Sequence, residues 1–393
     1  MKQAATASLT RSLNRSAILN LIRAEGPIAR TQIAQRLKLS LPTVMRAVES
    51  LAAEDLILFT GSEASGGRRR PLLAFNGAAH AVIGIDLGGT KMYGTVTDLN
   101  GKVQHQQRLA WEEAGGSAHA LERLYTLIEE LLAAPRPPGQ TLRGIGVGAP
   151  GVTLSEPGVV VWAPGLGWRD LPLKRLLSER FGLPVCVEND LNAAALGEYG
   201  FGVARGTPNL VCISIGTGIG AGILIEGRLY RGHNHGAGEV GYMLPDPGYL
   251  GRRYDEFGAL EGAASGPGIA ARAQRLLADE GHALAGQPLT AEDVFRLARE
   301  GEAWAQRIVG ETVDYLSQAI AAISALLDPE AIVIGGGVAR SADLLIEPIR
   351  ARLDGVVPFV PRILASDLGP QAVVLGAIML VLDATTGYVL INP

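Results

Sequence analysis

The sequence is poor in cysteine and contains no long apolar run, and each absence excludes a class of protein. Its only two cysteines, Cys186 and Cys212, lie in apolar stretches. That pattern is typical of cytosolic proteins and argues against a disulfide framework. The start, MKQAATASLTRSLNRS, has no apolar core of signal-peptide length. No uninterrupted apolar run reaches the ~18 residues of a membrane-spanning helix. We therefore expect a cytoplasmic protein with no membrane partner.

The chain also lacks a strong overall charge, but its charge is unevenly distributed. Residues 1–80 carry eleven Lys and Arg against five Asp and Glu, a net +6, whereas the whole chain has a net charge of −4. The remainder therefore carries −10. A basic N-terminal segment joined to an acidic body suggests that only the N-terminal segment binds a polyanion. An ordinary solvated surface would also produce this asymmetry, so charge alone does not decide.

What the chain does have is length, apolar residues and glycine. Its 393 residues, 47% of them hydrophobic, suggest two or three domains with a large core. The 51 glycines cluster in loops rather than in low-complexity tracts. The body is therefore expected to be α/β with tight turns.

Helical spacing in the first 78 residues predicts three helices. The first closes at Gly26-Pro27, the second covers residues 31–37, and the third follows the capping residue Ser40. Two helices joined by a three-residue turn form a helix-turn-helix. The second of them enters the major groove with its N-terminal residues near base edges. The predicted DNA contacts on this helix are Ser40, Leu41, Pro42, Thr43 and Arg46.

A β-hairpin is predicted after these helices. Residues 56–59 and 71–75 have strand character, and a Gly/Ser loop that ends in three arginines separates them. An Arg-rich tip can enter a narrow minor groove, whose negative potential attracts guanidinium groups. A small helical bundle with a solvated loop is the alternative. Because helices, hairpin and basic tip occur in order, we favour a winged DNA-binding domain over residues 1–78. Its wing contacts would be Arg68, Arg69 and Arg70.

From residue 79 onward, strand–turn–strand units with glycine turns dominate. Residues 81–98 contain a buried strand, a Gly88-Gly89 turn and a return strand, and residues 210–225 repeat this pattern about 130 residues later. Such repetition suggests a duplicated domain with a cleft between its halves. A third glycine turn, at 335–337, also follows an apolar strand.

Glycine turns let backbone N–H groups approach an anion closely. One such turn is weak evidence, but three of them favour a nucleotide cleft that is neither a P-loop nor a Rossmann fingerprint. The predicted nucleotide contacts are Asp86, Gly88, Gly89, Thr90, Lys91, Gly216, Thr217, Gly218, Gly335, Gly336 and Gly337.

Polar residues follow the apolar strand at residues 184–187. Asp190 could accept a proton from a sugar hydroxyl that attacks a γ-phosphate, and Asn189 could bridge two neighbouring hydroxyls. An Asp that begins a helix is equally well explained as its N-cap. Both interpretations remain open from spacing alone.

Five motifs resemble the ROK family of repressors and sugar kinases: DLGGTK at 86–91, GVGAPG at 146–151, ENDLNAAALGE at 188–198, ISIGTGIGAG at 213–222 and GAGEVGY at 236–242. The likeness covers the whole chain, and the winged helix resembles that of the family's repressor branch. The resemblance to this family implies a two-lobed, actin-like ATPase (RNase H-like) sugar-kinase body. We place the body at 79–393, with lobe 1 at about 79–190 plus the C-terminal helix and lobe 2 at about 191–370.

The resemblance also implies partners and site residues. Operator DNA, a small sugar effector and a homodimeric or homotetrameric assembly are expected. Asp190 would be the catalytic base, and ATP with Mg would be the cofactor if kinase activity survives. The implied sugar contacts are Gly151, Asn189, Asp190, Glu239 and Glu261.

The sequence departs from the family pattern where typical members bind zinc. Tyr242 occupies the place of a histidine, and Arg252, Tyr254 and Ala259 occupy the places of three cysteines. We therefore expect no zinc, since two upstream histidines, His233 and His235, do not make a metal site. Gly165 stands where many members have Asn.

Two functions follow from these features. A sugar-responsive transcriptional repressor of carbohydrate genes is favoured by the winged helix and by the altered zinc loop. An ATP-dependent hexose-type kinase, also able to bind DNA, is the alternative because the nucleotide turns and Asp190 are intact.

Overall fold

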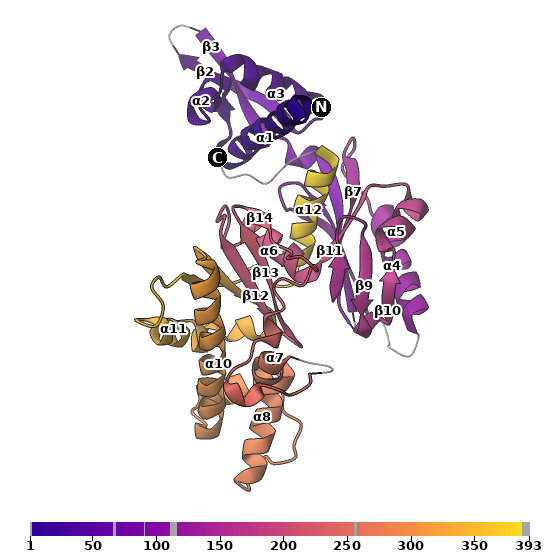
Figure 1. Ribbon diagram of the computed structural model, residues 1–393. Helices are drawn as coiled ribbons and strands as arrows, with labels where there is room; N and C mark the ends of the chain where they lie inside the picture. Colours follow the sequence, from indigo (N-terminus) through magenta and orange to yellow (C-terminus); the bar gives the residue numbers. More distant parts are fainter. Residues whose placement is uncertain (1, 66–67, 90, 111–115, 255–257, 387–393) are drawn as a thin grey trace. The chain divides into compact units, whose positions relative to one another are not determined.

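The computed structural model describes residues 2–65, 68–89, 91–110, 116–254 and 258–386. The chain folds into two compact units (Figure 1). Unit 1 contains residues 1–197, 226–228 and 373–393, and unit 2 contains residues 198–225 and 229–372. Within the described ranges, no helix is both long and apolar enough to cross a membrane.

The winged helix at the start of unit 1 confirms the predicted order of elements. Its bounds are α1 Lys2–Glu25, β1 Ile28–Ala29, α2 Arg30–Arg36, α3 Leu41–Ala53, β2 Ile57–Ser65 and β3 Arg68–Phe75. The strands form a small sheet in the order β1-β3-β2. Ile18, Ile33 and Val48, one from each of the three helices, are fully buried. These apolar stripes hold α3 against α1 and α2.

The wing differs from the expected loop with an arginine tip. Strand pairing continues to Ser65 and Arg68, so all three arginines belong to β3. Arg70 lies opposite Glu63 in the hairpin register. The predicted strand was too short because Gly61 and Ser62 resemble a turn, whereas the structure accommodates them in a β-bulge between Phe59 and Ser62.

The rest of unit 1 is a five-stranded sheet covered by helices. Its strands run in the order β11-β7-β4-β5-β6. The bounds are η1 Gly77–Ala79, β4 His80–Leu87, β5 Lys91–Asp98, β6 Val103–Ala110, α4 Gly116–Ala133, β7 Thr141–Ala149, α5 Leu173–Phe181, β11 Val185–Asn189, α6 Asp190–Phe201 and α12 Gln371–Thr386. A small sheet contains β8 Val152–Leu154, β9 Val159–Ala163 and, after η3 Pro164–Leu166, β10 Trp168–Leu171.

Unit 2 contains a second five-stranded sheet, in the order β14-β13-β12-β15-β16. Its strands are β12 Leu210–Ile215, β13 Ile219–Ile225, β14 Arg228–Leu229, β15 Ala331–Gly335 and β16 Arg362–Ala365. The helices are η4 Val240–Tyr242, η5 Pro247–Tyr249, α7 Ala259–Ala264, α8 Gly266–Asp279, α9 Ala291–Glu300, α10 Ala303–Leu327, η6 Gly337–Ser341 and α11 Ala342–Leu353. Arg228 belongs to β14, which pairs within this sheet, but its contacts assign it to unit 1.

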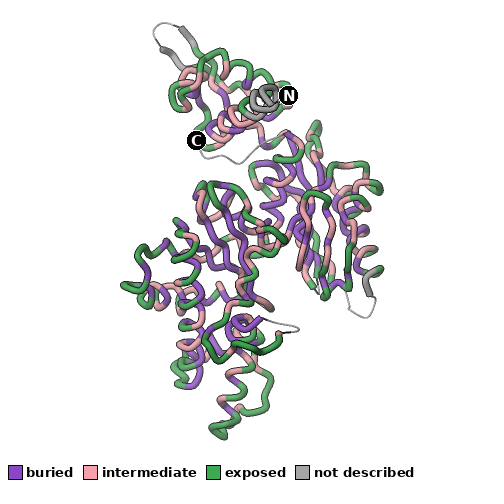
Figure 2. The backbone as a smooth tube through the Cα atoms, viewed as in Figure 1, coloured by how far each residue is buried: buried purple, intermediate pink, exposed green. Residues whose placement is uncertain are grey.

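The two sheets have the same topology, which confirms the duplication seen in the sequence. In each, an antiparallel hairpin (β4–β5 or β12–β13) is followed by two parallel strands (β7 and β11, or β15 and β16). Each sheet has its own buried apolar cluster, and the strands of both are largely buried (Figure 2). The equivalent hairpin turns carry the first two glycine motifs.

Candidate functional site

The N-terminal half of α3 presents an exposed face with a self-contained cap. Ser40 Oγ accepts a hydrogen bond from the Thr43 backbone N–H at 3.3 Å, and the two hydroxyl oxygens lie 2.8 Å apart. Ser40 is therefore the N-cap, as predicted. Leu41, Pro42 and Arg46 are exposed. These side chains are available to a ligand, while the two hydroxyls already bond each other.

Arg70 is oriented by the helix-turn-helix. Its guanidinium donates a hydrogen bond to Thr31 Oγ1 of α2 at 3.2 Å, and its side chain remains exposed. Nearby, Arg30 stacks on the ring of Phe59, 5.5 Å from the ring centroid. These contacts place one cation of the hairpin and one of α2 where the hairpin meets the helix-turn-helix. The side chains of Arg68 and Arg69 lie outside the described residues.

The first glycine turn connects β4 to β5. The Gly88 N–H donates to the Lys91 carbonyl at 2.9 Å, and a side chain at Gly88 would meet that oxygen. Burial raises the pKa of Asp86 to about 6, and the positive charge of Lys91 opposes the increase. A partly buried carboxylate at the end of a strand could hold a hydrated cation such as Mg²⁺. Gly89 is exposed, and the predicted contact Thr90 lies outside the described residues.

The junction of β11 and α6 distinguishes Asn189 from Asp190. Asn189 Oδ1 accepts hydrogen bonds from the N–H groups of Leu191 and Asn192, at 3.0 and 3.1 Å, and is the N-cap of α6. Its Nδ2 donates to the Gly151 carbonyl at 3.1 Å. Asp190 is the first helical residue, and its Oδ1 accepts from the Leu191 N–H at 2.9 Å. The N-cap of α6 is thus Asn189, so helix capping does not account for Asp190.

A buried glutamate that sequence reasoning missed supports this junction. Glu188 is 1% exposed. Its Oε1 accepts hydrogen bonds from Ser155 Oγ, the Asn189 N–H and Asn192 Nδ2, at 2.8, 3.0 and 3.0 Å. Glu188 therefore joins the turn after β8 to the start of α6. Its place in a strand of apolar neighbours was the only signal in the sequence.

Gly151 has a structural reason to be glycine. Its φ is +78°, and a Cβ there would lie 2.1 Å from the Trp162 carbonyl oxygen. Both restrictions exclude other residues. The Gly151 carbonyl is the acceptor for Asn189, so this predicted sugar contact holds the neighbouring one in place.

In unit 2, the second and third glycine turns line one cavity of about 500 Å³. Gly216 and Thr217 come from the β12–β13 turn, and Gly337 begins η6 after β15. Parallel pairing of β12 with β15 brings these turns together although they are far apart in sequence. Gly336 has φ +80°, and a Cβ there would lie 2.4 Å from the Ile215 carbonyl. Of the predicted contacts in these two turns, Gly218, Gly335 and Gly336 are not in the cavity lining.

The shape and lining of this cavity suit a nucleoside. The remaining walls include the N-terminal residues of α8, Gly266 and Pro267, and the ring of Phe295. A concave, mostly apolar lining with a few polar groups is typical of a small-molecule site. Arg340 and Glu292 form an exposed ion pair, 3.5 Å apart, among the lining residues.

Glu239 and Glu261 form a carboxylate pair in unit 2. Burial raises the pKa of both glutamates, and the negative charge of Glu239 raises the pKa of Glu261 further. Gly238, with φ +94°, lets the Glu239 turn dock on β13, where Ala221 donates its N–H to the Gly238 carbonyl at 2.7 Å. Gly151, Asn189 and Asp190 belong to unit 1, so three of the five predicted sugar contacts lie in unit 1 and two lie in unit 2.

The loop where typical family members bind zinc is held by aromatic and polar contacts. Tyr254 Oη donates to the Tyr249 carbonyl at 3.1 Å, and Arg252 stacks on the Tyr249 ring, 5.0 Å from its centroid. The described residues contain no group of three or more His, Cys, Asp or Glu that could hold a metal. These contacts hold the described part of this loop together.

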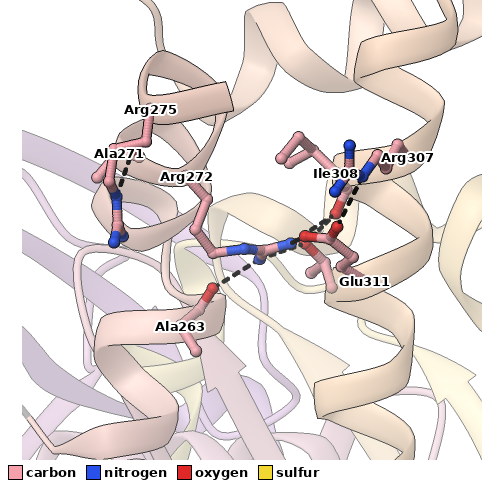
Figure 3. Close-up of polar contacts among 8 residues, drawn as sticks. Ala263, Ala271, Arg272, Arg275, Arg307, Ile308 and Glu311 are labelled. Atoms are coloured by element: carbon pink, nitrogen blue, oxygen red, sulfur yellow. Dashed lines mark hydrogen bonds and ion pairs between the residues drawn. The ribbon is translucent and has the colours of Figure 1, made fainter. Parts of the chain in front are cut away.

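Arg272 anchors the helix that carries Glu261. Its guanidinium donates to the carbonyls of Ala263 and Ile308, at 2.8 and 3.1 Å, and to Glu311 Oε2 at 2.8 Å (Figure 3). These bonds tie α7 and α8 to α10. The neighbouring Arg275 makes one bond, to the Ala271 carbonyl of its own helix at 3.4 Å. The two arginines thus differ sharply in their structural role.

Metal removal is expected to leave unit 2 folded. Because Tyr242, Arg252, Tyr254 and Ala259 offer no thiolate or imidazole, a zinc chelator should not change the unfolding temperature. Arg272→Ala should lower it, since loss of a largely buried, charged hydrogen-bond donor costs about 2 kcal/mol, whereas Arg275→Ala should not. The measurements are calorimetry with and without chelator and elemental analysis of protein purified without added metal. Stoichiometric zinc, or unfolding by the chelator, would contradict the expectation.

Known proteins resemble this chain over its full length. The ROK family pattern matches residues 82–384, and a winged helix-turn-helix DNA-binding pattern matches residues 11–57. The xylose repressor of Caldicellulosiruptor bescii is 30% identical over 96% of this chain and 97% of its own length. A ROK family transcriptional regulator, a homologue of the E. coli MLC protein, superposes with a TM-score of 0.83 at 27% identity and covers 96% of this chain and 98% of its own.

A kinase structure matches the body. The ROK family glucokinase from Streptomyces griseus, solved with glucose and AMPPNP, has a TM-score of 0.66 at 30% identity and covers 76% of this chain and 98% of its own. The repressors match the winged helix as well as the body, and the kinase matches the body. The chain thus belongs to the ROK family and has the architecture of its winged helix-turn-helix repressors.

Proposed function

We propose that this protein is a sugar-responsive transcriptional repressor that binds operator DNA through α3 and the β2–β3 hairpin. The observation that carries the proposal is the union, in one chain, of an exposed recognition helix and a sugar-kinase body. The xylose repressor and the MLC-like regulator share both parts. A sugar that binds the body would alter the affinity of the winged helix for DNA.

Direct contacts within unit 1 give the body a means to influence the winged helix. Arg15 of α1 donates to the Thr386 carbonyl of α12. Arg143 of β7 donates to the carbonyl of Glu54, which follows α3, at 2.8 Å. Arg15 also forms an ion pair with Glu54 at 2.6 Å. A shift of β7 or α12 would therefore move α1 or the C-terminal end of α3.

The effector that fits the proposal is a small sugar. Carboxylate pairs such as Glu239 with Glu261 suit a ligand that presents several hydroxyl donors. A sugar that lacks one of those hydroxyls would leave a buried acceptor unpaired, which is costly. We propose a homodimer, because two winged helices that read half-sites about one helical turn apart lose their register after a small rotation.

An ATP-dependent sugar kinase is the second candidate. It is favoured by the nucleoside-sized cavity beside Gly216 and Gly337 and by the position of Asp190 at the start of α6. Asp86 would hold Mg²⁺, and the glycine turns would hold ATP phosphates. This activity is compatible with DNA binding in the same chain.

Two variants should separate the two binding activities. DNA sites are selected from a random library with the full-length protein, and sugars are screened by thermal shift, because a ligand of the folded state raises its stability. Arg46→Ala should weaken DNA binding by about 5- to 150-fold, the worth of one good base contact, and keep the sugar shift. Glu261→Gln should lose the sugar shift and keep DNA binding. Failure of the wild type to select any DNA sequence would contradict the repressor proposal.

A further inference from the structure

Two apolar side chains of α3 are partly exposed beside its buried stripe. Leu41 is 41% exposed and Met45 is 40% exposed. At about 100° per residue, these two side chains lie roughly 40° apart around the helix axis. They lie between the stripe that buries Val44, Val48 and Leu51 in the domain core and the exposed Arg46. Part of each apolar side chain is therefore accessible to a ligand that contacts this edge of the helix.

The hydroxyl groups at this end of α3 are engaged with each other. Ser40 and Thr43 bond each other through the cap, at 2.8 Å between their oxygens. Thr43 is half-buried. Pro42 has no donor, so Arg46 is the strong hydrogen-bond donor on this part of the helix. Readout by hydroxyl groups is thus disfavoured relative to apolar contact.

We infer that Leu41 and Met45 read the C5-methyl groups of thymines in the major groove, next to a base read by Arg46. The inference rests on the proposed DNA binding and deepens it by naming the chemistry of the preferred site. Thymine is the base that presents a methyl group in the major groove, and apolar side chains contact it there. Met45 was absent from the contacts predicted from sequence.

The surroundings of the two side chains favour DNA as the occupant of this face. Lys38, Arg46 and Arg70 are exposed cations on or beside the helix-turn-helix, and Arg36 of α2 forms an ion pair with Glu25. Residues 1–80 carry a net charge of +6. A partner protein that bound this face through Leu41 and Met45 would have to bury or pair these charges, whereas phosphates flank the floor of the major groove on both sides.

The test removes single methyl groups from DNA. A site selected by the full-length protein from a random library is synthesised with each thymine of one half-site replaced in turn by deoxyuridine, and Kd is measured by fluorescence anisotropy at one fixed salt concentration. Loss of one buried methyl should weaken wild-type binding roughly fourfold at one or two positions. Other thymine positions should change little.

Matched variants assign the effect to the two side chains. Met45→Ala, or Leu41→Ala, should weaken binding to the thymine site and abolish the penalty for deoxyuridine at one position. Leu326→Ala is the control, because Leu326 is 83% exposed on α10 of unit 2 and should retain the full penalty. Both α3 variants should fold, since neither side chain belongs to the core, and calorimetry checks this.

The possible outcomes are distinguishable. A wild type that binds its selected site with equal affinity with and without thymine methyls overturns the inference but leaves DNA binding intact. A deoxyuridine penalty that persists in both α3 variants also overturns it. A change of oligomeric state in Met45→Ala without a change in methyl dependence identifies this face as a contact between copies instead. Selection of no DNA at all contradicts the proposed function itself.

Discussion

Asp86→Asn is expected to stabilise unit 1 by about 3 kcal/mol at pH 7.5 and to weaken any response to MgATP. Burial raises the pKa of Asp86 from 3.8 to about 6, and each pKa unit corresponds to about 1.4 kcal/mol. The ionised carboxylate is therefore destabilising at neutral pH in the absence of a cation. Asparagine has nearly the same shape and carries no charge.

The pH dependence of this effect follows from the direction of the shift. The folded state binds the Asp86 proton more tightly than the unfolded state, so stability falls as pH rises from 3.8 to about 6 and then levels off. The advantage of Asp86→Asn should accordingly be small near pH 4 and complete above pH 7. Hydrogen exchange of peptides that cover β4 and β5, measured across this range, reports the local free energy of opening.

Asp98→Asn provides the control for Asp86→Asn. Asp98 is also buried and belongs to β5 of the same sheet, but its Oδ1 accepts hydrogen bonds from the N–H groups of Asn100 and Lys102, both at 2.9 Å. Its replacement should bring no gain in stability. A pH-independent gain for Asp86→Asn, or an equal gain for Asp98→Asn, would show that burial of charge is not the cause.

Asp190→Asn is expected to lower sugar-dependent ADP release by a factor of about 10² to 10⁴ and to leave operator binding unchanged. General-base catalysis is typically worth this much, and asparagine cannot accept the hydroxyl proton. The α6 N-terminus should persist, because its cap is Asn189 rather than Asp190. ADP release with and without sugar, alongside operator binding, gives both readouts on one preparation.

Asp170→Asn is the matched control for Asp190→Asn, since Asp170 is an exposed carboxylate of β10 in the same unit. It should retain any turnover of the wild type. Wild-type turnover of roughly 1 s⁻¹ or faster, lost in Asp190→Asn, would make the kinase primary. If the wild type is inactive but its DNA binding responds to sugar, the body is a sensor. Its glycine turns would then be inherited remnants or a site where nucleotide tunes the response.

Local patterns in the sequence were sufficient for the elements and for the family. The helices that contain Ile18, Ile33 and Val48 were predictable because apolar residues recur about every 3.6 residues on the buried face of a helix. Ser40 was recognisable as a cap because capping acts over three residues of chain. The glycine turns after apolar strands, and their repetition, likewise predicted the two equivalent sheets that the structure contains.

The structure was required to assign helix caps and strand ends to within one or two residues. Whether Asn189 or Asp190 caps α6 depends on which carbonyl begins the helix, and both residues cap well. The wing strands were predicted too short because a bulge at Gly61 and Ser62 has the same local signature as a turn. In each case the neighbouring strand or helix selects between alternatives of similar intrinsic energy.

Contacts between distant residues were decided by tertiary structure alone. Gly216 and Gly337 line one cavity because β12 pairs with β15, and Arg70 is oriented by Thr31 of α2. Strand pairing and side-chain bonds across more than 30 residues leave no periodic trace in the sequence, since any apolar strand could occupy the neighbouring position. The sequence by itself therefore determined the parts and the family of this protein, and the tertiary structure determined which of its polar groups are engaged in the fold and which are exposed.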